Sequence, residues 1–121
     1  MGKTRMNNYQ HKKPGVYIYY SSEIKDVSVF DDVLFGIEEE GIPYEIKKQK
    51  QLDSYELSHT AAQDSRLAVG IGVHISGEIT LTLNKLKKEK PLLIANLEWE
   101  KDNLRNLGAN AGRLVKGIPF K

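Results

Sequence analysis

One short apolar segment, residues 66–73 (RLAVGIGV), constrains the fold of this chain more than any other stretch. It is rich in β-branched residues, lies between polar and turn-forming residues, and is too short for an ordinary helix. We therefore expect a strand over residues 67–73 that is buried on both faces, in the middle of an α/β sheet. Because Gly70 and Gly72 have no side chain to pack, a neighbouring backbone or helix should approach the strand closely there.

The same glycines do not match a phosphate-binding loop. In a G-x-G-x-x-G motif starting at Gly70, Ile75 stands where the third glycine belongs, and the first two glycines lie inside an apolar run instead of at a strand-to-helix turn. The sequence G-x-x-x-x-G-K-[ST] does not occur among the 121 residues. We therefore expect that this chain alone binds no nucleotide.

The length and composition predict one domain of ordinary globular type. The 121 residues fit a single compact domain. The chain contains no cysteine, which excludes disulfides, thiol chemistry and cysteine metal sites. No run of residues is apolar enough for a membrane span or a signal-peptide core, so we expect a cytoplasmic protein with no membrane partner.

The basic residues are unevenly distributed. Residues 1–13 contain Lys3, Arg5, Lys12 and Lys13 and no acid, so the net charge of +2 conceals a mildly acidic remainder. This polar segment has no periodicity, which predicts a mobile basic leader at 1–13 before a single α/β domain at 14–121. A nucleic-acid-binding arm is the alternative to a solubilising leader, but four cations without a basic folded face form a weak electrostatic footprint. We predict no nucleic-acid partner.

The rest of the chain alternates between strand and helix patterns. Strands are predicted at residues 16–20, 44–49, 67–73, 79–83 and 92–97, and helices at 27–40, from Asp53 or Ser54 to about 63, and at 102–116. Strand–helix–strand units imply parallel pairing of the first three strands, and the short connection before residue 79 makes the fourth antiparallel. The predicted fold is a mixed, mostly parallel sheet of about five strands flanked by about three helices. Charged residues in the strand at 44–49 indicate an edge position.

The ends of the first and last predicted helices carry recognisable signals. Gly-Ile-Pro follows each of them, at 41–43 and 117–119, with glycine suited to the left-handed cap and proline preventing continuation. Asp102 is predicted to cap the start of the last helix. Gly108 and Gly112 lie one turn apart in that helix and leave one face without side chains. This face permits close packing against another element of the domain or against a partner.

Residues for autonomous catalysis are not evident. The three histidines, His11, His59 and His74, have no acidic or histidine partner at the spacing of a zinc site or a catalytic triad. The G-x-S-x-G sequence of a nucleophile elbow is also missing. We therefore predict that the isolated chain is not an enzyme.

An acidic cluster, Glu38, Glu39 and Glu40, lies at the end of the first predicted helix. Acids at a helix C-terminus oppose its partial negative charge, which costs up to about 1 kcal/mol each. A solvated surface tolerates this cost; the alternative is that one glutamate binds a hard cation such as Mg²⁺ or Ca²⁺. Successive helical residues point about 100° apart, so only one of them can be the ligand. The remaining ligands would come from another molecule.

Three segments, in order along the chain, give it a resemblance to a known family. They are residues 36–43 (GIEEEGIP), residues 65–73 (SRLAVGIGV) followed by 76–79 (SGEI), and residues 107–120 (LGANAGRLVKGIPF). Together they resemble the small subunit of diol or glycerol dehydratase reactivase. The resemblance extends from Pro14 to the C-terminus, and the sequence LGANA is its most specific part.

The resemblance implies a fold similar to the medium (β) subunit of adenosylcobalamin-dependent dehydratase, and a chaperone-like role. Such small subunits associate with a large ATPase subunit, commonly as a heterotetramer, and bind the inactivated dehydratase. The small subunit is then exchanged for the dehydratase subunit that it mimics, and damaged cobalamin leaves. ATP is hydrolysed by the large partner, so ATP and ADP are expected on that partner only. In the family, the position matching Glu39 reaches a divalent metal at the interface with the large subunit.

Other interpretations compete with this one. The chain could be the medium subunit of the dehydratase itself, an independent α/β module that binds a small molecule, or an enzyme whose catalytic residues the patterns do not reveal. Both glycerol and propane-1,2-diol dehydratases are candidate clients of a reactivase. A bacterial microcompartment is a candidate location within the cytoplasm.

Overall fold

The structure, a computed structural model, describes residues 13–50 and 52–121. Within them, five strands form one mixed sheet in the order β2-β1-β3-β4-β5. The strands are β1 (Val16–Ser21), β2 (Tyr44–Gln49), β3 (Val69–Val73), β4 (Glu78–Leu83) and β5 (Leu93–Asn96). The helices are a 3₁₀-helix, η1 (Val27–Phe30), and the α-helices α2 (Asp31–Glu39), α3 (Ser54–Asp64) and α4 (Lys101–Lys116).

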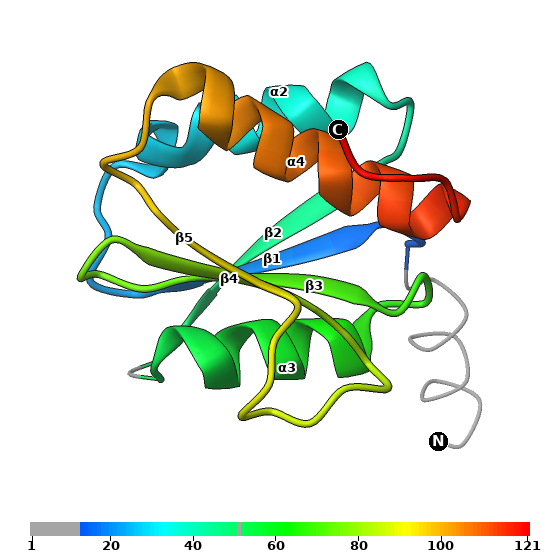
Figure 1. Ribbon diagram of the computed structural model, residues 1–121. Coiled ribbons are helices and arrows are strands. Elements are labelled where there is room, and N and C mark those ends of the chain that lie inside the picture. The colour runs from blue at the N-terminus through cyan, green and yellow to red at the C-terminus, as the bar shows by residue number, and fades with distance from the viewer. Residues whose placement is uncertain (1–12, 51) are drawn as a thin grey trace.

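The directions of the first four strands are those that the sequence predicts. β1 pairs in parallel with both β2 and β3, whereas β4 is antiparallel to β3 and β5 is antiparallel to β4. Helices α2 and α4 cover one face of the sheet, and α3 covers the other (Figure 1). The predicted mixed α/β sheet with three flanking helices is therefore confirmed, and β2 lies at an edge as expected.

Alternation along the strands divides the core into two layers. Val16 and Ile18 of β1 are fully buried in the main core, on the side of α2 and α4. The intervening Tyr17 and Tyr19 form a smaller cluster on the α3 side, together with Leu57. None of the helices in the part of the chain that is described is long and apolar enough to cross a membrane.

The glycines of β3 allow α3 to lie directly against the sheet. A Cβ atom on Gly70 would lie 2.4 Å from the carbonyl oxygen of Ser58, and one on Gly72 would lie 2.4 Å from that of Ser54. Real Cβ atoms do not approach backbone atoms so closely, so only glycine fits at either position. The close approach predicted from the sequence is confirmed, and α3 is the helix that makes it.

The predicted start of this strand, at residue 67, is wrong by two residues. β3 begins at Val69 because a turn precedes it, in which the Ala68 N–H donates to the Ser65 carbonyl over 3.0 Å. Ala68 has φ 66°, a left-handed conformation that a strand cannot contain. The other strand ends agree with the predictions to within one residue.

The helix predicted over residues 27–40 is interrupted. Asp26 caps a 3₁₀-turn through the Ser28 N–H, and Phe30, with φ −117° and ψ 24°, separates this turn from α2. Phe30 is fully buried. Phe30 therefore fits the helical spacing of the apolar residues of α2, although its backbone is not part of the helix.

The helix-start signals were only partly right. Asp53 caps α3 in a reciprocal capping box with Glu56, which selects it over Ser54. The predicted cap at Asp102 is wrong, because the N-cap of α4 is Glu100, two residues earlier, and Asp102 lies in the first turn. There its charge still suits the positive end of the helix. Gly117 closes α4 with φ 71°, as predicted.

Helices α2 and α4 touch through glycines. A Cβ atom on Gly108 would lie 1.8 Å from the carbonyl oxygen of Val33, and one on Gly112 would lie 2.7 Å from the Cβ of Glu40. The face free of side chains thus packs within the domain, which decides between the two predicted alternatives. Gly36 of α2 is a third such position, where an added Cβ atom would lie 1.9 Å from the carbonyl oxygen of Arg105. The sequence patterns did not reveal it.

Candidate functional site

The three glutamates at the end of α2 have different surroundings. Glu38 accepts a hydrogen bond of 3.0 Å from the hydroxyl of Tyr44. The Glu39 side chain is 46% exposed, whereas that of Glu40 is only 10% exposed. The cluster therefore does not converge on one point, as the helical geometry requires.

Glu40 joins the ends of α2 and α4. Its Oε1 lies 2.7 Å from Lys116 Nζ, and its Oε2 lies 3.1 Å from Arg113 Nε. The hydrogen bond from Lys116, and then that from Arg113, hold the pKa of the Glu40 carboxyl below its ordinary value. The unfavourable charge predicted at this helix end is thus compensated within the chain, so Glu40 does not require a metal ion.

Glu39 has a looser partner. Its Oε2 lies 3.6 Å from Arg105 Nη1, and Nη2 of the same guanidinium lies 3.5 Å from Asp32. The guanidinium carbon also lies 5.8 Å from the centre of the Phe35 ring. A separation of 3.6 Å is too long for a good hydrogen bond, so the half-exposed Glu39 carboxylate keeps its capacity to bind another group.

The chemistry of Glu39 fits a hard divalent cation in part. Carboxylate oxygen is the ligand that Mg²⁺ and Ca²⁺ prefer. Across residues 13–50 and 52–121, no group of three or more histidines and acids could hold a metal ion. The described residues therefore do not complete a metal site at this place, and the role of Glu39 as a metal ligand stays a prediction.

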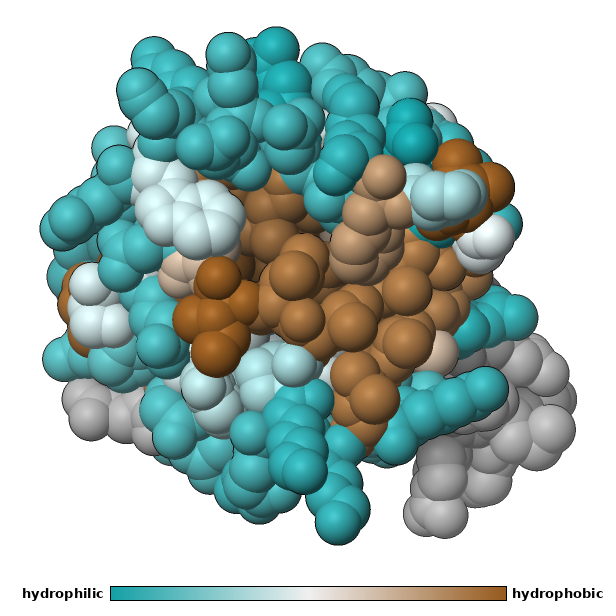
Figure 2. Space-filling model, in the orientation of Figure 1, coloured by the Kyte–Doolittle hydropathy of each residue, from teal (hydrophilic) through white to brown (hydrophobic). Residues whose placement is uncertain are grey.

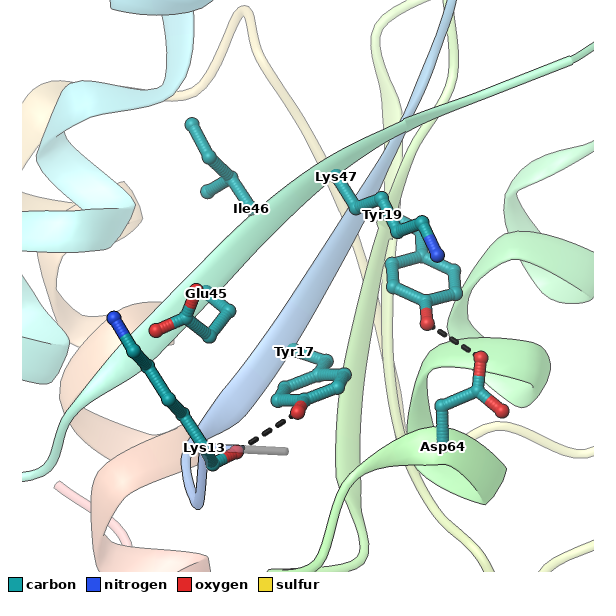
Figure 3. A pocket seen from close by; sticks show the side chains of 7 residues that line it. All are labelled: Lys13, Tyr17, Tyr19, Glu45, Ile46, Lys47 and Asp64. Carbon is teal, nitrogen blue, oxygen red and sulfur yellow. Dashed lines mark hydrogen bonds between the residues drawn. The ribbon is translucent and has the colours of Figure 1, made fainter. Parts of the chain in front are cut away.

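A separate hollow of about 490 Å³ lies on the α3 side of the sheet, where α3 leaves β2 uncovered (Figure 3). The Tyr17 hydroxyl donates to the carbonyl oxygen of Lys13 over 2.8 Å, and the Tyr19 hydroxyl donates to Asp64 Oδ2 over 2.5 Å. Burial, and then the contact with Asp64, raise the pKa of Tyr19. The lining residues are Lys13, Tyr17, Tyr19, Glu45, Ile46, Lys47 and Asp64. Two cations and two anions among them leave this hollow without a dominant charge.

The described histidines stand apart from acids. His59 lies on α3, and its buried Nδ1 has no hydrogen-bond partner. His74 Nδ1 lies 2.9 Å from the hydroxyl of Ser76, in the turn between β3 and β4. His11 is outside the described residues. A histidine–carboxylate pair suited to catalysis is therefore not present in the part of the chain that the structure covers.

The sequence patterns missed the basic partners of the acidic cluster, Arg105, Arg113 and Lys116. Arg113 and Lys116 lie in the last turn of α4, where cations suit the negative end of the helix. That local signal explains their presence but does not identify a glutamate on another helix as the partner.

Comparison with known proteins identifies the family of this chain. Residues 13–121 match the family described as dehydratase medium subunit. The chain belongs to the dehydratase medium subunit family. The match covers the whole sheet and both α2 and α4, the helices that Glu40 joins.

Within the dehydratase medium subunit family, the similar curated proteins are reactivating-factor subunits. The probable glycerol dehydratase-reactivating factor small subunit of Citrobacter freundii is 36% identical over 108 residues, which cover 88% of this chain and 92% of the relative. The propanediol dehydratase-reactivating factor small subunit of Citrobacter freundii is 37% identical over 108 residues, covering 89% and 90%.

Solved structures of reactivating factors are also similar to this chain. A glycerol dehydratase reactivase matches with a TM-score of 0.86 and 37% identity, over 90% of this chain and 97% of the matched chain. A diol dehydratase-reactivating factor complexed with ADP and Mg²⁺ matches with a TM-score of 0.83 and 32% identity, over 90% and 98%. The resemblance to reactivase small subunits that the sequence motifs indicated is confirmed.

Proposed function

We propose that this chain is the non-catalytic small subunit of an ATP-dependent reactivating factor for an adenosylcobalamin-dependent diol or glycerol dehydratase. The observation that carries this proposal is its similarity, over nearly the whole domain, to reactivating-factor small subunits in both sequence and structure. The name "small subunit" implies a large partner, which is the proposed ATPase. The proposed place of action is the cytoplasm, where a bacterial microcompartment could enclose the complex.

The proposed mechanism is subunit exchange. The match to the dehydratase medium subunit family supports it, because exchange requires this chain to resemble the dehydratase subunit whose place it takes. The small subunit leaves the large subunit and replaces the medium subunit on inactivated dehydratase, so that damaged cobalamin can leave. The chain contributes a rigid body to this exchange, in which Glu40 fixes α2 to α4.

We propose that Glu39 holds a divalent cation at the interface with the large subunit. Its exposed carboxylate and weak internal partner support this role. Because the described residues do not complete a metal site by themselves, the ion would be shared between two molecules. The ion would supply attraction between carboxylates of the two chains. We propose that ATP and ADP bind to the large subunit only; the similar factor complexed with ADP and Mg²⁺ supports a nucleotide and an ion somewhere in such an assembly.

The medium subunit of the dehydratase itself is the second candidate, because the matching family carries that name. An independent small-molecule-binding module is the third, and the hollow beside Tyr17 and Tyr19 is where its ligand would bind. A medium subunit should restore turnover to a dehydratase that lacks its own. A binding module should take up its ligand without a partner.

Cobalamin release tests the proposed function. Dehydratase inactivated with cobalamin trapped inside is incubated with ATP, Mg²⁺ and the large subunit, with and without this chain, and free cobalamin is measured after filtration. The proposal predicts release only when this chain and ATP are both present. Equal release without the chain would contradict it. Turnover by a dehydratase reconstituted with this chain in place of its medium subunit would favour the second candidate.

A further inference from the structure

The two edges of the sheet differ in their protection against strand pairing. β2 forms one edge and β5 the other. β2 (YEIKKQ) contains a glutamate and two lysines, whereas β5 (LIAN) contains no charged residue. Charged side chains on an edge strand discourage pairing with another chain. Of these two edges, therefore, only β5 is open to pairing with another chain.

The side chains around β5 are also apolar and exposed. Ile94 is 48% exposed, and Leu92 and Trp99 on either side of the strand are 38% and 45% exposed. Figure 2 shows apolar surface gathered at the centre of the face that β5 crosses in Figure 1. A hollow of about 190 Å³ lies next to the strand and is lined by Leu93, Ile94, Trp99, Asn103, Asn106, Leu107 and Asn110, none of which is charged.

The hydrogen-bonding direction of β5 follows from its register with β4. The Leu97 N–H donates to the Gly77 carbonyl over 2.8 Å, and Ala95 is the partner of Ile79. In an antiparallel ladder, every second residue directs its backbone groups to the same neighbour. The backbone N–H and C=O of Ile94 therefore point away from β4, toward the open edge.

The segments that flank β5 carry opposite charges. Residues 85–90 before it contain four lysines and one glutamate, whereas residues 98–102 after it contain three acids and one lysine. Lys90 and Glu98, the nearest charged residues on each side, are both exposed. A strand with a basic start and an acidic end is complementary to its own copy running in the opposite direction.

We propose that β5 pairs antiparallel with β5 of a second copy of this chain, so that one sheet continues across a two-fold symmetric dimer. If two Ile94 residues face each other, the basic segment 85–90 of one copy lies on the same side as the acidic segment 98–102 of the other. The two-fold axis repeats each contact. The self-complementary charge pattern favours a second copy over a different protein as the occupant of this edge. The proposal goes beyond the reactivating function and does not depend on it.

The molar mass of the isolated full-length chain tests the proposal. Sedimentation velocity over about two orders of magnitude in concentration should show a mass that rises from 13.7 kDa toward twice this value. Ile94→Lys places two like charges opposite each other and should raise the dimer dissociation constant by at least about tenfold. Val29→Lys is the matched control: Val29 is 47% exposed but lies in η1, so the dimer should be unchanged.

A charge exchange makes the test specific for the antiparallel register. Lys90→Glu and Glu98→Lys should each weaken the dimer several-fold, and the double variant should restore it, because both pairs then regain opposite charges. Far-ultraviolet circular dichroism confirms that the variants fold. A wild-type chain that stays monomeric throughout, or a double variant as weak as the single ones, overturns the proposal. The proposal is also overturned if Ile94→Lys leaves the dimer intact and abolishes binding to the large subunit, because the large subunit would then bind the β5 edge.

Discussion

Lys116 Nζ donates to Glu40 twice, over 2.7 Å to the carboxylate and over 2.9 Å to the backbone carbonyl. The second contact satisfies a carbonyl group at the end of α2 that has no partner within its own helix. One lysine on α4 therefore neutralises the last acid of the cluster and completes the end of the helix that carries it. Glu39, one residue earlier, is left as the exposed carboxylate.

This junction predicts a pH-dependent effect of Glu40→Gln. Because the pKa of Glu40 is lowered in the folded chain, its contribution to stability is present above its ordinary value of 4.5 and is lost as the pH falls through the lower, folded-state pKa. The variant should unfold at a lower urea concentration than the wild type at pH 7, and the difference should close in the range below pH 4.5. A difference that stays constant with pH would contradict this account.

Glu39→Gln should act on assembly and not on folding. In the complex with the large subunit, metal analysis by mass spectrometry should find about one divalent ion fewer per copy of this chain, and the complex should dissociate more readily. The melting temperature of the isolated chain should barely change, since exposed ion pairs contribute about 0–1 kcal/mol. Glu38→Gln, next along the helix, is the control. If Glu39→Gln leaves both metal content and assembly unchanged, the cluster is an ordinary solvated surface.

Most of the fold could be predicted because its determinants are local. The β-branched run before residue 73 predicted the central strand, and Gly70 and Gly72 predicted the close approach of a backbone or helix, which is α3. The start of α3 followed in the same way from a local signal, which left Asp53 and Ser54 as the two candidate caps. The interruption at Phe30 did not follow, because this fully buried residue keeps the apolar spacing of a helix although its backbone leaves the helical conformation.

The candidate site was predictable only in part. The acidic cluster is visible in the sequence, but the partners of Glu40 lie 73 and 76 residues further along the chain. Which glutamate they neutralise depends on how α2 and α4 cross, and that crossing depends on Gly36, Gly108 and Gly112. The exposure of Glu39 is therefore a consequence of tertiary packing.

Gly108→Ala tests the crossing itself. The new Cβ would lie 1.8 Å from the Val33 carbonyl oxygen, so the two helices must separate. We expect the free energy of unfolding to fall by at least about 2 kcal/mol, although alanine favours a helix by about 1 kcal/mol over glycine. Urea denaturation measures the change. Asn106→Ala, at an exposed position of the same helix, should have little effect; equal effects of the two substitutions would contradict the packing described.

Thr80→Val tests the contact between β4 and α3. Thr80 is fully buried, and its Oγ1 lies 2.7 Å from both the Ser54 carbonyl oxygen and Ser58 Oγ. Valine has nearly the same shape but removes the hydroxyl that is hydrogen-bonded to these two groups, which should lower the free energy of unfolding by about 1–2 kcal/mol.

Thr82→Val, on the same strand, is the matched control for Thr80→Val. Thr82 is also buried, but its hydroxyl makes only a 3.5 Å contact with the Leu83 carbonyl. The loss in this variant should be about 0.5 kcal/mol or less. Indistinguishable urea midpoints for the two variants would show that the hydrogen bonds of Thr80 do not stabilise the domain.

The most direct test of the reactivating function is to co-express this chain with the large reactivase ATPase from the same source. Size-exclusion chromatography with mass determination then reports whether the two proteins form a complex. We predict that they elute together with a mass corresponding to a stoichiometric complex. Elution of this chain alone, as monomer or dimer, beside an unbound ATPase would contradict it.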